Sequence, residues 1–125
     1  MSDFNKVILV GNLTKDPEIY YTPKGNLKVN LRIAINRRYK KQEELREEVC
    51  FVTIVVFGKQ AESCKQFLQK GRKILVEGRL QTHSYEDKTL QKHSILEVMA
   101  NNIMFLSAPN RPEKLEEEND FSATE

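Results

Sequence analysis

Aromatic and basic side chains gather on one side of a predicted strand at residues 49–57. Side chains of a strand alternate between two faces, so one face carries three aliphatic residues, at positions 52, 54 and 56, and predicts a core. The other face carries Phe51 and Phe57, and Lys59 follows closely. Flat rings beside cations are the chemistry that stacks on nucleic-acid bases and pairs with phosphates. The alternative is that both phenylalanines form a second buried layer.

Two tyrosines extend this pattern along the chain. Tyr39 stands among the four cations of residues 37–41. Residues 37–48 have no apolar period, and we predict them to be a charged loop. The alternative for Tyr39 is a solvated hairpin tip. Tyr85 ends a strand with a polar face, so we expect its ring to be exposed. These tyrosines and the two phenylalanines are therefore predicted to form one discontinuous stacking track of Tyr39, Phe51, Phe57 and Tyr85.

Basic residues near these rings are the candidates for phosphate contact. They are Lys6, Lys28, Arg32, Arg37, Arg38, Lys40, Lys59, Lys70 and Arg79. Such cations bind a polyanion through counterion release and speed its encounter with the protein. The bases of a duplex are already stacked on one another, so exposed rings on a sheet favour a single strand as the partner.

Charge and length suggest one domain and a tail. The chain has 125 residues and a net charge of +2. Residues 109–125 hold two basic and six acidic side chains, a net charge of −4, which leaves +6 for residues 1–108. We predict a binding domain at 1–108 and an acidic, disordered tail at 109–125. Without a spanning apolar run or a secretion signal, we expect a cytoplasmic protein with no membrane partner.

Catalysis finds little support in the residue types. His83 and His93 are isolated from other metal-binding side chains, so no metal site is expected. The glutamates of residues 43–48 lack the apolar surroundings that would raise a carboxyl pKa. No glycine-rich phosphate loop occurs, and we expect no cofactor and no enzymatic activity. Cys50 and Cys64 stand in apolar patterns and are predicted to be buried free thiols.

The periodicity predicts a mainly β fold with one helix. The helix is expected over residues 60–70, with an apolar stripe and a stop at Gly71. Five strands are expected, at residues 5–13, 27–36, 49–57, 74–85 and within 90–106. Three strands, one helix and two strands form the layout of a five-stranded Greek-key OB-fold barrel, with the helix between strands 3 and 4. A small β-sandwich is the alternative.

Several motifs, in order, resemble the bacterial single-stranded DNA-binding protein family over residues 4–107. They are Asn5-Lys-Val-Ile-Leu-Val-Gly-Asn-Leu-Thr-Lys-Asp-Pro-Glu18, Asn36-Arg-Arg-Tyr39, Val56-Phe-Gly-Lys59, Lys70-Gly71 and Val76-Glu-Gly-Arg-Leu80. The resemblance implies an OB-fold that stacks DNA on Tyr39, Phe51, Phe57 and Tyr85. It also implies a homotetramer, associated with the nucleoid, that protects single-stranded DNA in replication, recombination and repair. Several of the stacking positions hold tryptophan in well-known members, and this chain has none.

The tail departs from that family. Members usually end in an acidic tip that closes on a C-terminal phenylalanine and recruits replication and repair proteins. Here the segment Glu116-Glu-Glu-Asn-Asp-Phe121 is similar to that tip, but Ser122-Ala-Thr-Glu125 follows it. Partner recruitment is therefore not assigned to this tail. Two other functions stay open: an OB-fold primosome accessory protein, which would be a dimer, and a protein-interaction module whose basic face binds an acidic partner.

Overall fold

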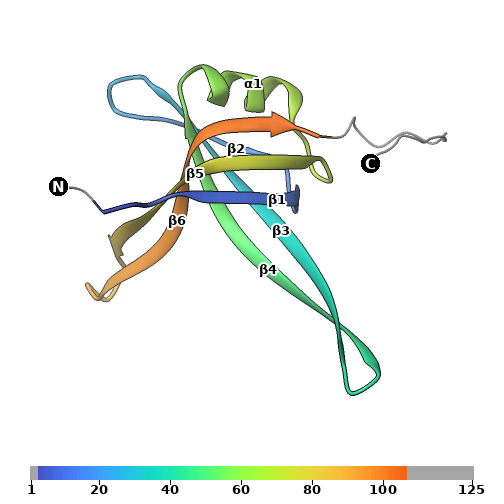
Figure 1. Ribbon diagram of the computed structural model, residues 1–125. Coiled ribbons are helices and arrows are strands. Elements are labelled where there is room, and N and C mark those ends of the chain that lie inside the picture. The colour runs from blue at the N-terminus through green and yellow to red at the C-terminus, as the bar shows by residue number, and fades with distance from the viewer. Residues whose placement is uncertain (1–2, 107–125) are drawn as a thin grey trace.

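The computed structural model describes residues 3–106, and strands dominate it (Figure 1). The predicted tail and the domain boundary at residue 108 lie outside the described residues. The elements in chain order are β1 (Val7–Leu13), β2 (Glu18–Tyr21), β3 (Leu27–Lys41), β4 (Glu44–Phe57), α1 (Lys59–Phe67), β5 (Lys73–Glu86) and β6 (Lys92–Phe105).

Five of these strands close into a barrel. The sheet order is β1-β5-β6-β4-β3, and pairing of β1 with β3 joins its two ends. All of these pairs are antiparallel except β4 with β6, while β2 adds an antiparallel edge strand to β3. The helix α1 follows the third strand of the barrel and precedes the fourth. The predicted five-stranded barrel with its helix is therefore confirmed.

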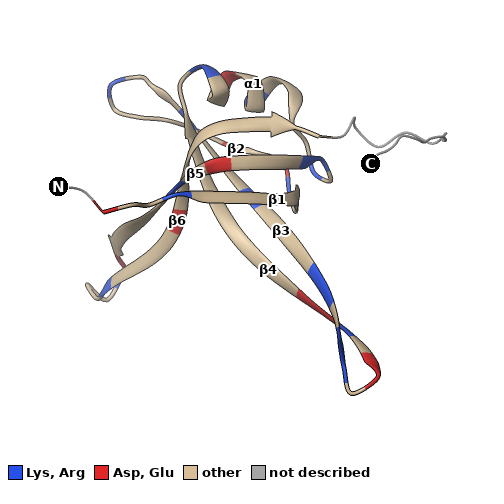
Figure 2. Ribbon diagram, viewed as in Figure 1, with Lys and Arg blue, Asp and Glu red and all other residues tan. Residues whose placement is uncertain are grey.

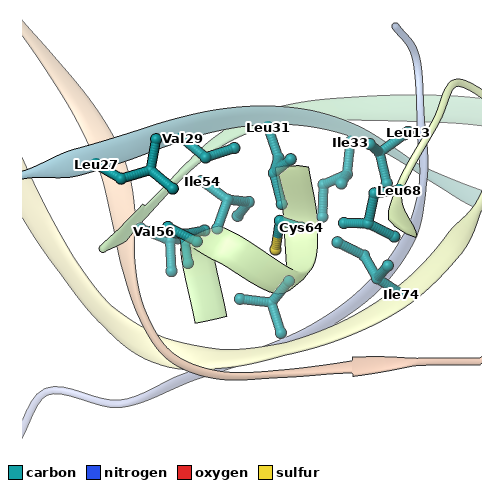
Figure 3. Close-up of a cluster of buried hydrophobic side chains, with 13 residues drawn as sticks. Leu13, Leu27, Val29, Leu31, Ile33, Ile54, Val56, Cys64, Leu68 and Ile74 are labelled. Carbon is teal, nitrogen blue, oxygen red and sulfur yellow. The ribbon is translucent and has the colours of Figure 1, made fainter. Parts of the chain in front are cut away.

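One cluster of aliphatic side chains fills the barrel (Figure 3). Alternate residues of β3 point inward, and Val29, Leu31 and Ile33 have almost no exposed surface. The helix α1 adds small side chains to the same cluster through Ala61 and Cys64. The remaining members are Leu13, Leu27, Ile54, Val56, Leu68, Ile74, Val76 and Val98. The core is small, so each of its positions contributes measurably to stability.

Close crossing of strands requires a glycine at one point of the barrel. A Cβ atom on Gly78 would lie 2.2 Å from the backbone oxygen of Met99 on β6. The pairing of β5 with β6 shifts register between Glu77 and Gly78, which marks a β-bulge. Bulges bend and twist a strand locally, as closure of a small barrel demands.

The prediction of a loop at residues 37–48 is wrong. Instead, β3 and β4 run past the barrel as a two-stranded ribbon (Figure 1). The tight turn between them is formed by Gln42 and Glu43, which have φ angles of 53° and 68°, as a two-residue hairpin loop requires. Opposite charges at paired positions, visible along the ribbon in Figure 2, replace the missing apolar period.

Other sequence predictions also need correction. The edge strand β2 was not predicted, because four residues are too few for a clear period. Cys50 is exposed rather than buried, since it faces the core side of the ribbon where β4 is leaving the barrel. The helix ends at Phe67 rather than near residue 70, and Phe67 itself is exposed. Gly71, with φ 94°, belongs to the turn that follows.

No helix within residues 3–106 is long and apolar enough to cross a membrane.

Candidate nucleic-acid interface

The solvent side of β3 and β4 carries the two phenylalanines. In the register of these strands, Lys28 pairs with Phe57 and Ala34 pairs with Phe51, so both rings lie on the face opposite the core. Phe51 is 54% exposed and Phe57 is 42% exposed. A second buried layer within the protomer is therefore wrong. Both rings are available for contact with another molecule.

The same face continues across β6 and β5. Val55 of β4 pairs with Met99 of β6, and Met99 pairs with Arg79 of β5. Alternation along β5 then brings Gln81, His83 and Tyr85 to this side. We call the solvent side of β3, β4, β5 and β6 the outer face. Its side chains include Lys28, Asn30, Arg32, Phe51, Thr53, Phe57, Arg79, Gln81, His83 and Tyr85.

Tyr85 lies within a short row of rings on the outer face. Its ring is stacked with that of His83 at 6.3 Å and with that of His93 at 5.3 Å between centroids. The tyrosine is 45% exposed, as expected. The spacing of two places His83 on the same face as Tyr85, as the sequence indicates. The stacking of His93 was not predicted, because it depends on the pairing of Tyr85 with His93 across β5 and β6.

A hairpin turn at Asp87 positions this row of rings. The carboxylate of Asp87 accepts hydrogen bonds from the hydroxyl of Thr89 at 2.7 Å and from the backbone of Gln91 at 3.0 Å. Its other oxygen lies 2.6 Å from Nε2 of His93. These bonds, chiefly those of Thr89 and then His93, lower the pKa of Asp87 to about 2. The turn therefore ties His93 to the hairpin that carries Tyr85.

Cation and ring occur together on the outer face. The guanidinium carbon of Arg32 lies 5.3 Å from the ring centre of Phe51. Arg32 also donates a hydrogen bond of 3.4 Å to the hydroxyl of Thr53. An arginine over an aromatic ring adds a cation–π attraction and keeps a positive charge where a phosphate can pass. This pair has the composition of a site that stacks a base and binds its phosphate.

A hollow of about 210 Å³ lies on the outer face. Lys28, Arg32 and His83 are among its lining residues and make part of its rim basic or polar. Two acidic side chains also reach it. Glu18 is paired with Lys15 at 2.9 Å, and Glu97 is buried and accepts a hydrogen bond of 2.8 Å from Gln81. Both carboxylates have partners already, which limits their repulsion of a phosphate.

Tyr39 lies on the ribbon, and its position along β3 differs in parity from that of the outer-face residues. Alternation along β3 places it on the core side of the ribbon, the face opposite that of Phe51. The guanidinium carbon of Arg37 lies 4.8 Å from its ring centre, and the tyrosine is half-buried. The structure thus brings Phe51, Phe57 and Tyr85 to one face and does not bring Tyr39 there. Its role in stacking stays a prediction.

The predicted phosphate-binding cations divide by their partners. Three of them pair with carboxylates: Arg37 with Glu48 and Lys6 with Glu77, each at 2.5 Å, and Arg38 with Glu47 at 3.8 Å. Exposed pairs of this kind are weak and can exchange a carboxylate for a phosphate. Six predicted phosphate-binding cations form no ion pair within residues 3–106, namely Lys28, Arg32, Lys40, Lys59, Lys70 and Arg79.

These unpaired cations lie at different places in the fold. Lys28, Arg32 and Arg79 are on the barrel part of the outer face, and alternation along β3 places Lys40 on the same side of the ribbon. Lys59 begins α1, directly after Phe57 and Gly58. Lys70 lies in the turn before β5, where its backbone N–H donates to Asp16 at 2.8 Å. Phosphate contact at each of them stays a prediction.

Neither a group of metal ligands nor a reactive thiol is found on the outer face within residues 3–106. Within residues 3–106, no three His, Cys, Asp or Glu side chains are grouped as metal ligands. Cys64 is a buried free thiol, as predicted, and burial raises its pKa to about 12. A thiol with so high a pKa is protonated and unreactive at neutral pH.

Comparison with known proteins finds one family and relatives that share its name. Residues 4–106 match the single-strand binding protein family. A single-stranded DNA-binding protein of Wolinella succinogenes is 45% identical over 121 residues, which cover 96% of this chain and 75% of that protein. One from Helicobacter hepaticus is 43% identical over 106 residues, covering 84% of this chain and 62% of that protein. The chain thus spans less than two thirds of the length of some relatives, such as the one from Helicobacter hepaticus.

Solved structures share the fold. A Plasmodium falciparum SSB in complex with ssDNA superposes with a TM-score of 0.79 at 24% identity, covering 86% of this chain and 98% of that one. A deletion mutant of the single-stranded DNA binding protein from Thermus aquaticus gives a TM-score of 0.73 at 33% identity, covering 83% of this chain and 51% of that one. The closed barrel is therefore an arrangement that known proteins share.

Proposed function

The chain belongs to the single-strand binding protein family, and we propose that it binds single-stranded DNA with little sequence preference, without catalysing a reaction. The observation that carries this proposal is the outer face, where three exposed rings lie among cations on one continuous sheet surface. Rings bind any base, because every base has a π-face, and cations bind the backbone that all sequences share.

The mechanism combines stacking with charge neutralisation. Bases stack on Phe51, Phe57 and Tyr85, and the backbone runs past Lys28 and Arg32. Each stacked base contributes about 1–3 kcal/mol. The cations release counterions from the backbone, so affinity falls as salt rises. A duplex gains only the second contribution, because its bases are stacked on one another and cannot reach the rings. Preference for single strands follows from this difference.

Four copies of the chain would supply a longer surface than one. A single barrel contacts few nucleotides, and linked barrels gain avidity from one bound strand. We therefore include a homotetramer in the proposal. Ile8 and Val10 on β1 are 61% and 42% exposed, and apolar side chains on one strand favour contact with another protomer. The tetramer would coat and protect exposed strands in replication, recombination and repair, in the cytoplasm at the nucleoid.

A labelled thymine oligonucleotide and a matched duplex test the proposal. Anisotropy titrations at several salt concentrations should give tight binding of the single strand and much weaker binding of the duplex. Equal affinity for both would reduce the outer face to a general polyanion surface and would contradict the proposal. Light scattering on the same sample should give the mass of four chains, and a dimer would contradict the tetramer.

A further inference from the structure

Tyr20 completes a row of side chains that was not evident from the sequence. On β2, Tyr20 pairs with Lys28 of β3, and Lys28 pairs on its other side with Phe57 of β4. All three side chains therefore lie on the same side of the sheet, with Lys28 between two rings. Neighbouring strands lie ~4.8 Å apart, so the backbones that carry the two rings are about 10 Å apart across the sheet.

The ring of Tyr20 resembles the stacking rings in exposure and surroundings. Tyr20 is 46% exposed, close to the 42% of Phe57. The ammonium nitrogen of Lys28 lies 5.7 Å from its ring centre. The pairing of an exposed ring with a cation repeats the arrangement of Phe51 and Arg32 on the neighbouring strands. Tyr20 thus has the two properties that mark a base-stacking position, an exposed ring and a neighbouring charge for the backbone.

The adjacent tyrosine has a different role. Tyr21 lies on the opposite face of β2, where its hydroxyl accepts a hydrogen bond of 3.0 Å from Lys65 of α1. The ammonium nitrogen of Lys65 also lies 5.7 Å from its ring centre. Tyr21 therefore attaches the edge strand to the helix. Although it is 59% exposed, it faces away from Lys28 and Phe57.

We propose that Tyr20 is a further base-stacking position, which carries the bound single strand from Phe57 across Lys28 onto β2. This inference rests on the proposed function. In this arrangement one base stacks on Phe57 and another on Tyr20, while the backbone between them passes Lys28. The edge strand β2 then becomes part of the binding surface, which widens the path beyond the strands of the closed barrel.

Four variants separate this role from a structural one. Tyr20→Ala removes the ring, Tyr20→Phe keeps it, and Tyr21→Ala removes the neighbouring ring on the opposite face. Phe57→Ala reports on the proposed function itself. Each folded variant is titrated into a labelled thymine oligonucleotide long enough to cross the sheet, and anisotropy gives the dissociation constant. Circular dichroism and thermal melting confirm that the barrel is intact.

Loss of one stacked base should weaken binding by about 5- to 150-fold. We expect that loss for Tyr20→Ala, with Tyr20→Phe and Tyr21→Ala close to the unsubstituted chain. Binding by Tyr20→Ala at full strength, while Phe57→Ala is weakened, would overturn the role of Tyr20 and leave the proposed function standing. Equal weakening by Tyr20→Ala and Tyr21→Ala would assign the effect to damage of β2. Full-strength binding by all four variants would overturn both proposals.

Cross-linking of the unsubstituted chain gives a second readout that does not depend on a variant folding. A thymine oligonucleotide that carries 5-iodouracil is irradiated in the complex, and the modified peptides are identified by mass spectrometry. A cross-link at Tyr20 is expected alongside those at the outer-face rings. Cross-links at Phe57 or Tyr85 without any at Tyr20 would contradict the extended path.

Discussion

Replacing Phe57 with alanine separates stacking from charge. The ring is 42% exposed, so slightly more than half of its surface is buried by folding. Because full burial of a phenylalanine contributes ~1.5–3 kcal/mol, the substitution should lower the free energy of unfolding by about 1–2 kcal/mol. The chain should remain folded. The exposed part of the ring is free to stack on a base, and its loss should weaken binding by about 1–3 kcal/mol.

Salt dependence identifies the cause of that loss. Phe57→Ala removes no charge, so the slope of log affinity against log salt should stay unchanged while the whole line moves down. Phe67→Ala is the matched control, because Phe67 is 56% exposed but lies on α1, outside the outer face. It should bind like the unsubstituted chain. If Phe57→Ala also binds like that chain, or if its salt slope flattens, the reasoning about stacking is refuted.

Three further predictions concern charge, packing and pH. Lys59→Ala should flatten the salt slope by ~0.7 if the lysine contacts one phosphate, whereas an unchanged slope in the anisotropy titrations would remove it from the interface. Gly78→Ala places a Cβ atom 2.2 Å from the backbone oxygen of Met99. The substitution should therefore destabilise the barrel by about 1–3 kcal/mol and lower the melting temperature. An unchanged melting temperature would show that the strands can separate there. Folding lowers the pKa of Asp87 from 3.8 to about 2, so its stabilising effect should be complete above pH 4 and disappear as the pH falls through about 2. A carboxyl NMR titration with its midpoint near 3.8 would contradict the hydrogen bonds of Asp87 at that turn.

Periodicity predicted the strands of the barrel because the alternation of apolar and polar residues depends only on each strand itself. Alternation along residues 27–36 requires nothing beyond the strand itself, and inward positions such as Val29 and Ile33 are buried as it indicates. The helix was also placed correctly between the third and fourth barrel strands. The short β2 gave no such signal, because its four residues are defined only by pairing with β3.

The ribbon shows what periodicity cannot detect. Residues 37–48 have no apolar alternation, yet they pair across β3 and β4 as Arg37 with Glu48 and Arg38 with Glu47. The useful signal was complementarity of charge around a two-residue turn, a relation between distant positions. The side of the ribbon that carries Tyr39 was also not predicted, because the register of the two strands fixes it.

The binding face was predicted in type but not in full extent. Phe51 and Phe57 were predicted because both lie on the face of one strand opposite its aliphatic face, and both are exposed. His93 and the ring of Tyr20 come to this side of the sheet only through pairing between strands. A sequence gives the parity of a residue within its own strand, and the fold decides which strands lie side by side.

The central claim is that bases stack on the outer face, and a crystal structure of the chain with a thymine oligonucleotide tests it most directly. The claim predicts bases in contact with the rings of Phe51, Phe57 and Tyr85, and a backbone that passes Lys28 and Arg32. An oligonucleotide bound to another face of the barrel, or held by lysines with no base on any of these rings, would contradict it.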